Sequence, residues 1–129
     1  MNQNAKRILI VDDNVALARV IQFAMEGAGF TTVAARNARI AFELAKQSQF
    51  DVVITDQQMP EMTGVELCRH LRDMPEYQEC PIILLTAKGL ELELPRLQHE
   101  LDIDATFSKP FSPSALVKTV NELLAVAVS

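Results

Sequence analysis

The 129-residue sequence predicts an α/β fold in which a five-stranded parallel sheet is covered by helices on both faces. Two patterns lead to this prediction. Short continuous apolar runs, typical of strands buried on both sides, alternate with longer segments whose apolar residues recur at helical spacing. Five such strand–helix units follow one another without a linker or an internal repeat. We therefore expect one domain over residues 1–129, with a core at about residues 6–127.

The first two units have the simplest patterns. Residues 8–11 are uniformly apolar and predict a buried strand. A helix follows from about Asn14 and ends at Gly27 and Gly29. Residues 31–35 predict a second, more polar strand near an edge of the sheet. The inner face of the helix that follows Asn14 comprises Leu17, Ile21, Ala24 and Ala28. Asn37 is a good N-cap for the next helix, whose inner face comprises Ile40, Ala41 and Leu44.

Capping signals and a proline place the next elements. Residues 52–55 form a third, β-branched strand. Thr63 and Glu66 have the spacing of a capping box, so the third helix begins at Thr63. Pro81 introduces a fourth strand at residues 82–85. The third helix, which precedes Pro81, presents Leu67 and Leu71 to the core.

The last unit contains a proline that limits its helix. Pro95 would remove a backbone donor inside a helix, so we expect the fourth helix to begin near Pro95, after an irregular loop. Asp102 can adopt the turn into a short fifth strand at residues 103–107. The fifth helix has an N-cap, a proline at its first position and an apolar face, supplied by Ser112, Pro113, and Leu116, Val120, Leu123 and Leu124.

Composition excludes several classes of protein. Hydrophobic residues make up 49% and charged residues 22%, a balance typical of soluble globular domains. The net charge of −5 argues against direct nucleic-acid binding. Apolar runs are far shorter than the ~20 residues of a membrane span, and the polar N-terminus lacks a signal-peptide core, so we expect a cytoplasmic protein. Cys68 and Cys80 are interpreted as buried or half-buried thiols without a bridge.

Polar residues with chemical potential stand where the predicted strands end. Asp12 and Asp13 follow the first strand, Asp56 the third, Thr86 the fourth and Lys109 the fifth. The carboxyl ends of parallel strands meet at one edge of the sheet, so these side chains are expected to gather there. Three neighbouring carboxylates repel one another, and Lys109 and a hard cation such as Mg²⁺ would offset that repulsion.

This combination of residues indicates a phosphoryl-transfer site. The Asp56 carboxylate would act as nucleophile and form an acyl phosphate. The Thr86 hydroxyl would hydrogen-bond a phosphoryl oxygen, while Lys109 and the metal would neutralise charge. Each residue alone has a simpler interpretation: an aspartate after a strand is commonly a turn or cap, a threonine a loop hydroxyl and a lysine a solvated cation. Their joint occurrence at four strand ends favours the functional interpretation.

Four stretches of the sequence, residues 8–14, 51–64, 83–88 and 107–111, carry a resemblance to a known family. They read ILIVDDN, DVVITDQQMPEMTG, ILLTAK and FSKPF. Along essentially its whole length, the chain resembles the receiver domains of response regulators in two-component signalling, such as the chemotaxis response regulator. The resemblance implies a flavodoxin-like, doubly wound sheet with strand order 2-1-3-4-5 and five helices.

The resemblance also implies roles for individual residues. Asp56 would accept a phosphoryl group from the phosphohistidine of a sensor histidine kinase or a phosphotransfer protein. Asp13, Asp56 and the backbone carbonyl of Gln58 would bind Mg²⁺ directly, and Asp12 would act through water. Lys109 would precede Pro110 through a cis peptide bond. Gln58 and Lys88 occupy positions that tune hydrolysis of the acyl phosphate.

The family also implies what lies up- and downstream of phosphorylation. The domain is expected to catalyse only its own phosphorylation and dephosphorylation, and so is no enzyme in the usual sense. Its partner would be a downstream effector protein or an output domain outside this sequence, with a phosphorylation-dependent dimer as a further possibility. Neither nucleic acid nor membrane is expected as a direct partner.

One position departs from the family. Receivers usually carry Tyr or Phe three residues before the lysine, where this chain has Thr106. The nearest aromatic, Phe107, should point to the opposite face because strand side chains alternate, and is interpreted as a core residue. We therefore expect an altered readout through the fourth helix and the fifth strand, and Pro95 reshapes the same surface.

Two other classes of function were weighed. A receiver-like adaptor that works without phosphorylation would not need the complete set of acids, hydroxyl and lysine. A small flavodoxin-like or phosphatase-like enzyme would need different motifs. Flavodoxins require a hydroxyl- and glycine-rich phosphate loop after the first strand, where Asp12 and Asp13 would repel phosphate, and dehalogenase-type phosphatases use Asp-x-Asp there.

Overall fold

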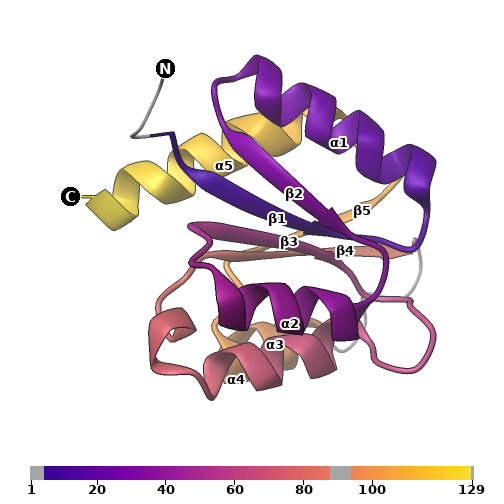
Figure 1. Ribbon diagram of the computed structural model, residues 1–129, viewed down its shortest axis with the longest axis vertical. Coiled ribbons are helices and arrows are strands. Elements are labelled where there is room, and N and C mark those ends of the chain that lie inside the picture. The colour runs from indigo at the N-terminus through magenta and orange to yellow at the C-terminus, as the bar shows by residue number, and fades with distance from the viewer. Residues whose placement is uncertain (1–4, 88–93, 129) are drawn as a thin grey trace.

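The computed structural model describes residues 5–87 and 94–128, and these form one parallel sheet between two layers of helices (Figure 1). The strand order is β2-β1-β3-β4-β5, as expected for the flavodoxin-like fold. The strands are β1 (Arg7–Val11), β2 (Thr31–Ala35), β3 (Val52–Asp56), β4 (Ile82–Ala87) and β5 (Ala105–Lys109). The helices are α1 (Val15–Gly27), α2 (Ala38–Gln47), α3 (Gly64–Arg72), α4 (Leu94–Leu101) and α5 (Pro113–Val128), with a short 3-10 helix η1 (Pro75–Tyr77) after α3.

The sheet separates two hydrophobic cores. Helices α1 and α5 cover one face, and α2, α3 and α4 cover the other (Figure 1). Alternate residues of β1 point to opposite faces, so Ile8 and Ile10 join the core under α1 and α5, whereas Leu9 and Val11 join the other. All four side chains are fully buried, which explains why the central strands are continuous apolar runs.

The predicted helix caps are present. The Asn14 and Asn37 side chains accept hydrogen bonds from the third residue beyond each of them, at 3.1 and 2.8 Å. Thr63 and Glu66 form both bonds of a capping box at the start of α3. Asp102 has a φ of 52° and makes the turn between α4 and β5, which also agrees with the expectation.

Two local expectations were wrong. Ala28 lies outside the inner face of α1 because it is the exposed C-cap, and Met25 is buried there instead. The fifth strand begins at Ala105 and extends to Lys109, two residues later than predicted. The reason is that the Asp104 carboxylate accepts a hydrogen bond from the Ile82 amide at 2.9 Å, so regular strand pairing begins only after it.

The expectations for the cysteines and for the start of α4 agree with the structure. Cys68 and Cys80 are buried free thiols, and burial raises the pKa of each to about 12, so neither is a ready nucleophile. Helix α4 starts at Leu94, beside Pro95. Among the described helices, none combines the length and hydrophobicity needed to cross a membrane.

One arginine links three segments on the side of the sheet covered by α3 and α4. Arg72, at the end of α3, donates from Nε to the Leu101 carbonyl at 2.8 Å and from Nη2 to the Asp102 carbonyl at 2.7 Å. Its Nη1 donates to the carbonyls of Tyr77 and Cys80. The side chain is only 13% exposed. A single guanidinium therefore holds the end of α4 and the approach to β4 against α3.

Replacement of Arg72 should destabilise the fold. Arg72→Met keeps the aliphatic stem but removes the donors to four carbonyls, so we expect the free energy of unfolding to fall by about 2–4 kcal/mol. Urea denaturation followed by circular dichroism measures this change. Arg69→Met is the matched control, because Arg69 contacts Glu100 at 3.5 Å and both side chains are about half exposed. An equal loss in both variants would contradict the role given to Arg72.

Candidate functional site

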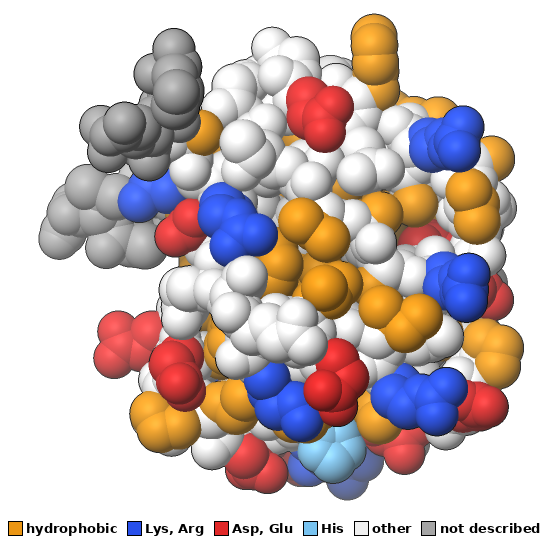
Figure 2. Space-filling model, in the orientation of Figure 1, with side chains coloured by type: hydrophobic (Ala, Val, Ile, Leu, Met, Phe, Trp, Pro, Cys, Tyr) orange, Lys and Arg blue, Asp and Glu red, His pale blue; other side chains and the backbone are white. Residues whose placement is uncertain are grey.

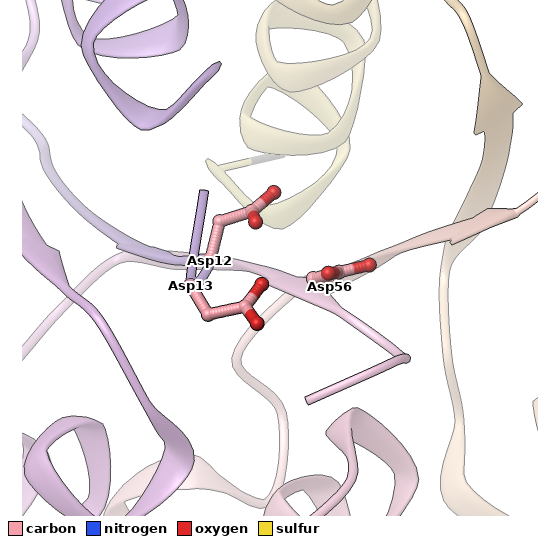
Figure 3. A group of neighbouring side chains, drawn as sticks. All are labelled: Asp12, Asp13 and Asp56. Carbon is pink, nitrogen blue, oxygen red and sulfur yellow. The ribbon is translucent and has the colours of Figure 1, made fainter. Parts of the chain in front are cut away.

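Three aspartates lie together at the carboxyl ends of β1 and β3. Asp12 and Asp13 follow β1 directly, and Asp56 is the last residue of β3, the strand that pairs with β1 (Figure 3). One carboxylate oxygen from each lies within 4.8 Å of the others. Asp12 and Asp56 are buried, whereas Asp13 is exposed. The structure thus brings the three predicted acids into one cluster that is open to solvent on one side.

Among the described residues, Lys109 is the basic side chain that forms ion pairs with this cluster. Its Nζ lies 3.2 Å from Asp56 Oδ1 and 3.4 Å from Asp12 Oδ2. It is the last residue of β5, so its side chain reaches past the end of β4 to meet the two acids. The charge of Lys109 alone does not balance three carboxylates.

The surroundings of Asp56 disfavour the charged form of its carboxylate. Burial is the main cause that raises its pKa, and the negative charge of Asp12 raises it further. Lys109 opposes both effects and lowers the pKa. Within the described residues, Asp56 Oδ1 accepts no hydrogen bond with good geometry, although Lys109 is close. A buried carboxylate oxygen without such a bond is suited to bind a cation or to act as a nucleophile.

Thr86 stands beside the acceptor strand. It is fully buried in β4 and follows Leu85, which pairs with Asp56. Its hydroxyl donates a long bond of 3.4 Å to the Ala87 carbonyl. Such a weak contact leaves the hydroxyl able to change partners.

The loop after β3 requires a glycine. The Gly64 amide donates to the Gln57 carbonyl at 3.1 Å, which closes the loop at the start of α3. A Cβ atom at Gly64 would overlap the backbone carbonyl oxygen of Asp56. Glu61, within the loop, has a φ of 70°, so the chain turns tightly here. The sequence analysis included Gly64 only as part of a motif, and its close approach to Asp56 becomes visible only in three dimensions.

Gln58 reaches across the site. Its side-chain Oε1 accepts a hydrogen bond of 3.0 Å from the Ala87 amide at the end of β4. The Lys109–Pro110 peptide bond is cis, as the resemblance implied. Lys88, the other position thought to tune hydrolysis, lies outside the described residues.

Thr106 and Phe107 lie as the strand alternation requires. Phe107 packs against the core under α1 and α5 and contacts Phe111 with ring centroids 5.9 Å apart. Thr106 pairs with Leu84 and points to the opposite face, toward the side of α4. The interpretation of Phe107 as a core residue is confirmed, and Thr106 is the side chain at the position usually aromatic.

Helix α1 also presents exposed large hydrophobic side chains that were not predicted from the sequence. Val15, Val20 and Phe23 are 57%, 48% and 82% exposed. A signal was present, because α1 carries more apolar residues than its buried face accommodates.

Comparison with known proteins identifies the family. Residues 8–121, most of the chain, match the family described as the response regulator receiver domain. The chain belongs to this family. The receiver domain is 36% identical over 121 residues to the transcriptional regulatory protein SrrA of Staphylococcus aureus, covering 93% of this chain and 48% of SrrA. It is 32% identical to the probable transcriptional regulator ycf29 of Pyropia yezoensis, covering 92% and 53%.

Solved receiver structures share the fold. The chemotaxis protein CheY4 of Vibrio cholerae superposes with a TM-score of 0.86 at 28% identity, covering 92% of this chain and 98% of CheY4. The receiver domain of a signal transduction histidine kinase from Syntrophus aciditrophicus gives a TM-score of 0.84 at 33% identity, covering 94% and 91%. The chain spans about half the length of the curated relatives it matches. The protein is therefore similar to receiver domains in regulators and kinases alike.

Substitution of Gly64 should damage the fold at the site. In Gly64→Ala the new methyl group overlaps the Asp56 carbonyl oxygen, so the backbone must shift, and we expect a loss of about 2–3 kcal/mol in unfolding free energy. Thermal denaturation measures the loss. Gly27→Ala is the control, because a Cβ there meets no atom within 4 Å, and its stability should change by less than about 1 kcal/mol. Wild-type stability in Gly64→Ala would refute the close packing.

Proposed function

We propose that this receiver domain accepts a phosphoryl group on Asp56 and thereby switches its contact with a partner. An Asp56 oxygen attacks the phosphorus of a phosphohistidine, the phosphorus–nitrogen bond breaks, and its electron pair stays on the imidazole. The product is an acyl phosphate on Asp56. The observation that carries the proposal is the buried Asp56 oxygen, which lies beside Lys109 and accepts no well-formed hydrogen bond from the described residues.

The acidic cluster fits Mg²⁺. Hard cations prefer carboxylate and carbonyl oxygens, and the three carboxylates lie close enough to share one ion. Asp13, Asp56 and the Gln58 carbonyl would hold the ion directly, with Asp12 acting through water. When bound, Mg²⁺ supplies the positive charge that the cluster lacks and brings phosphate oxygens close to Asp56.

Lys109 and Thr86 would act on the transferred group. The Lys109 ammonium already contacts Asp56 Oδ1 and would neutralise charge on the phosphoryl oxygens. The Thr86 hydroxyl, with only its 3.4 Å bond to give up, would move to a phosphoryl oxygen. Exchange of a weak contact for a charge-assisted hydrogen bond favours the phosphorylated arrangement.

The donor would be a sensor histidine kinase or a phosphotransfer protein. Helix α1 begins beside Asp12 and Asp13 with the exposed Val15, and Val20 and Phe23 offer further exposed apolar area along the same helix. On the face drawn in Figure 2, basic side chains are scattered among hydrophobic and acidic ones instead of forming a continuous stripe. Together with the net charge of −5, the lack of a basic stripe on this face favours a protein partner over nucleic acid.

Phosphorylation would act on a downstream effector protein or on an output domain, with a phosphorylation-dependent dimer as one form of the response. The domain would catalyse only its own phosphorylation and dephosphorylation, in the cytoplasm. A phosphorylation-independent adaptor is the second candidate. The contact of Lys109 with both buried acids disfavours it, because an adaptor gains nothing from keeping like charges buried together.

Phosphorylation of Asp56 can be tested with a small-molecule donor. Incubation with Mg²⁺ and acetyl phosphate should give an acid-stable, base-labile adduct in the intact mass, and Asp56→Asn should give none. Lys109→Met should slow adduct formation by about 10²–10³-fold, because a preorganised charge is lost. Removal of Mg²⁺ with a chelator should suppress the reaction. Asp73→Asn, at the exposed end of α3, is the matched control.

No adduct on the wild-type protein, or an equal adduct on Asp56→Asn, would refute the phosphoacceptor role and leave the adaptor as the better reading. Phosphorylation of Lys109→Met at the wild-type rate would refute only the role of the lysine.

Phosphorylation should cause only a small conformational change in α4 and β5. Thr106 lacks the aromatic ring that changes position on activation in many receivers. We therefore expect beryllofluoride to cause only small amide chemical-shift changes at Thr106 and α4. Thr106→Tyr, which restores a large ring, should enlarge these changes without altering those at Asp56. A large rearrangement at Thr106 and α4 in the wild-type protein would contradict the expectation.

A further inference from the structure

The Ala87 amide at the end of β4 has lost its expected strand partner. Alternate residues of a strand point the same way, so the Ala87 N–H faces β3 as the Leu85 carbonyl does. That carbonyl accepts from the Gln57 amide at 2.8 Å. The next acceptor along β3 would be the Gln57 carbonyl, but it is occupied by Gly64. Because β3 ends at Asp56, the chain beyond it no longer follows β4, and the Ala87 N–H lies at the end of the sheet without a strand acceptor.

The side chain of Gln58 fills this gap. Its Oε1 accepts from the Ala87 amide at 3.0 Å, a contact between residues 29 positions apart. Gln58 lies two residues after Asp56, and Ala87 directly follows the buried Thr86. The amide oxygen of Gln58 therefore occupies a backbone donor at the same end of β4 as the hydroxyl expected to bind phosphate.

We propose that Gln58 is a positioning residue that closes the Ala87 amide in the unphosphorylated protein. A phosphoryl oxygen on Asp56 carries more negative charge than an amide oxygen and makes a stronger hydrogen bond with a backbone N–H. Phosphorylation exchanges one oxygen for the other and releases the Gln58 side chain to solvent. The inference rests on the proposed phosphorylation of Asp56, and it gives Gln58 a side-chain role separate from its backbone carbonyl at the metal.

The exchange has a cost that can be measured. The phosphorylated or analogue-bound protein must first break the Gln58–Ala87 bond, so the bond opposes binding of the analogue. A neutral, solvent-accessible hydrogen bond of this kind corresponds to about a 3- to 10-fold effect on an equilibrium. The same bond protects the Ala87 amide from exchange with solvent in the free protein.

Hydrogen exchange and beryllofluoride binding test the inference together. In Gln58→Ala, the Ala87 amide of the free protein should exchange about 3- to 10-fold faster, and beryllofluoride at saturating Mg²⁺ should bind tighter by a similar factor. Gln58→Glu restores an acceptor and adds a negative charge. It should recover the protection of Ala87 and bind beryllofluoride at least about tenfold more weakly than Gln58→Ala.

Gln57→Ala is the matched control. The Gln57 side chain accepts from the Val65 amide at 2.8 Å, at the start of α3. Its loss should leave both readouts at wild-type values even if stability falls. Unchanged exchange and unchanged affinity in Gln58→Ala, or weaker binding of beryllofluoride, would overturn the role of Gln58 while Asp56 still formed its adduct with acetyl phosphate. Absence of that adduct would overturn the proposed function itself.

Discussion

The arrangement of the site depends on one electrostatic constraint: buried carboxylates share the end of a sheet with the ammonium group of Lys109. Asp12 and Asp56 are removed from water, and Lys109 lies within 3.4 Å of both. Parallel strand order makes this possible, because β1 and β3 are neighbours and β5 ends on the same edge. The fold holds like charges together at the expense of stability, and a bound cation would relieve that repulsion.

Most of the fold could be predicted because its signals are local. Apolar runs marked the strands, and Asn14, Asn37 and Thr63 marked helix starts with side chains that cap them in the structure. The fifth strand was misplaced by two residues because its start depends on Asp104 bonding to Ile82, a contact between residues 22 positions apart. Boundaries set by long-range hydrogen bonds leave no periodic pattern in the sequence.

The candidate site divides in the same way. The residue types at strand ends were enough to gather Asp12, Asp13, Asp56 and Lys109, because topology alone brings those positions together. The supporting contacts could not be predicted. Whether the Gln58 side chain turns to solvent or to Ala87 depends on the path of a loop, and so does the contact that forbids a side chain at Gly64. The supporting contacts of the site are therefore set by loop geometry.

The arginine at the end of α3 has a mechanical consequence. Arg72 fixes the last carbonyl of α4 and the carbonyl of Asp102, and it also holds the carbonyls before β4. A helix held at one end cannot slide along its neighbours without breaking several hydrogen bonds at once, but it can swing about that end. Arg72 therefore marks the point about which α4 would rotate. Displacement caused at the acceptor end of the sheet would be greatest at the start of the helix, beside Pro95, and smallest at Leu101.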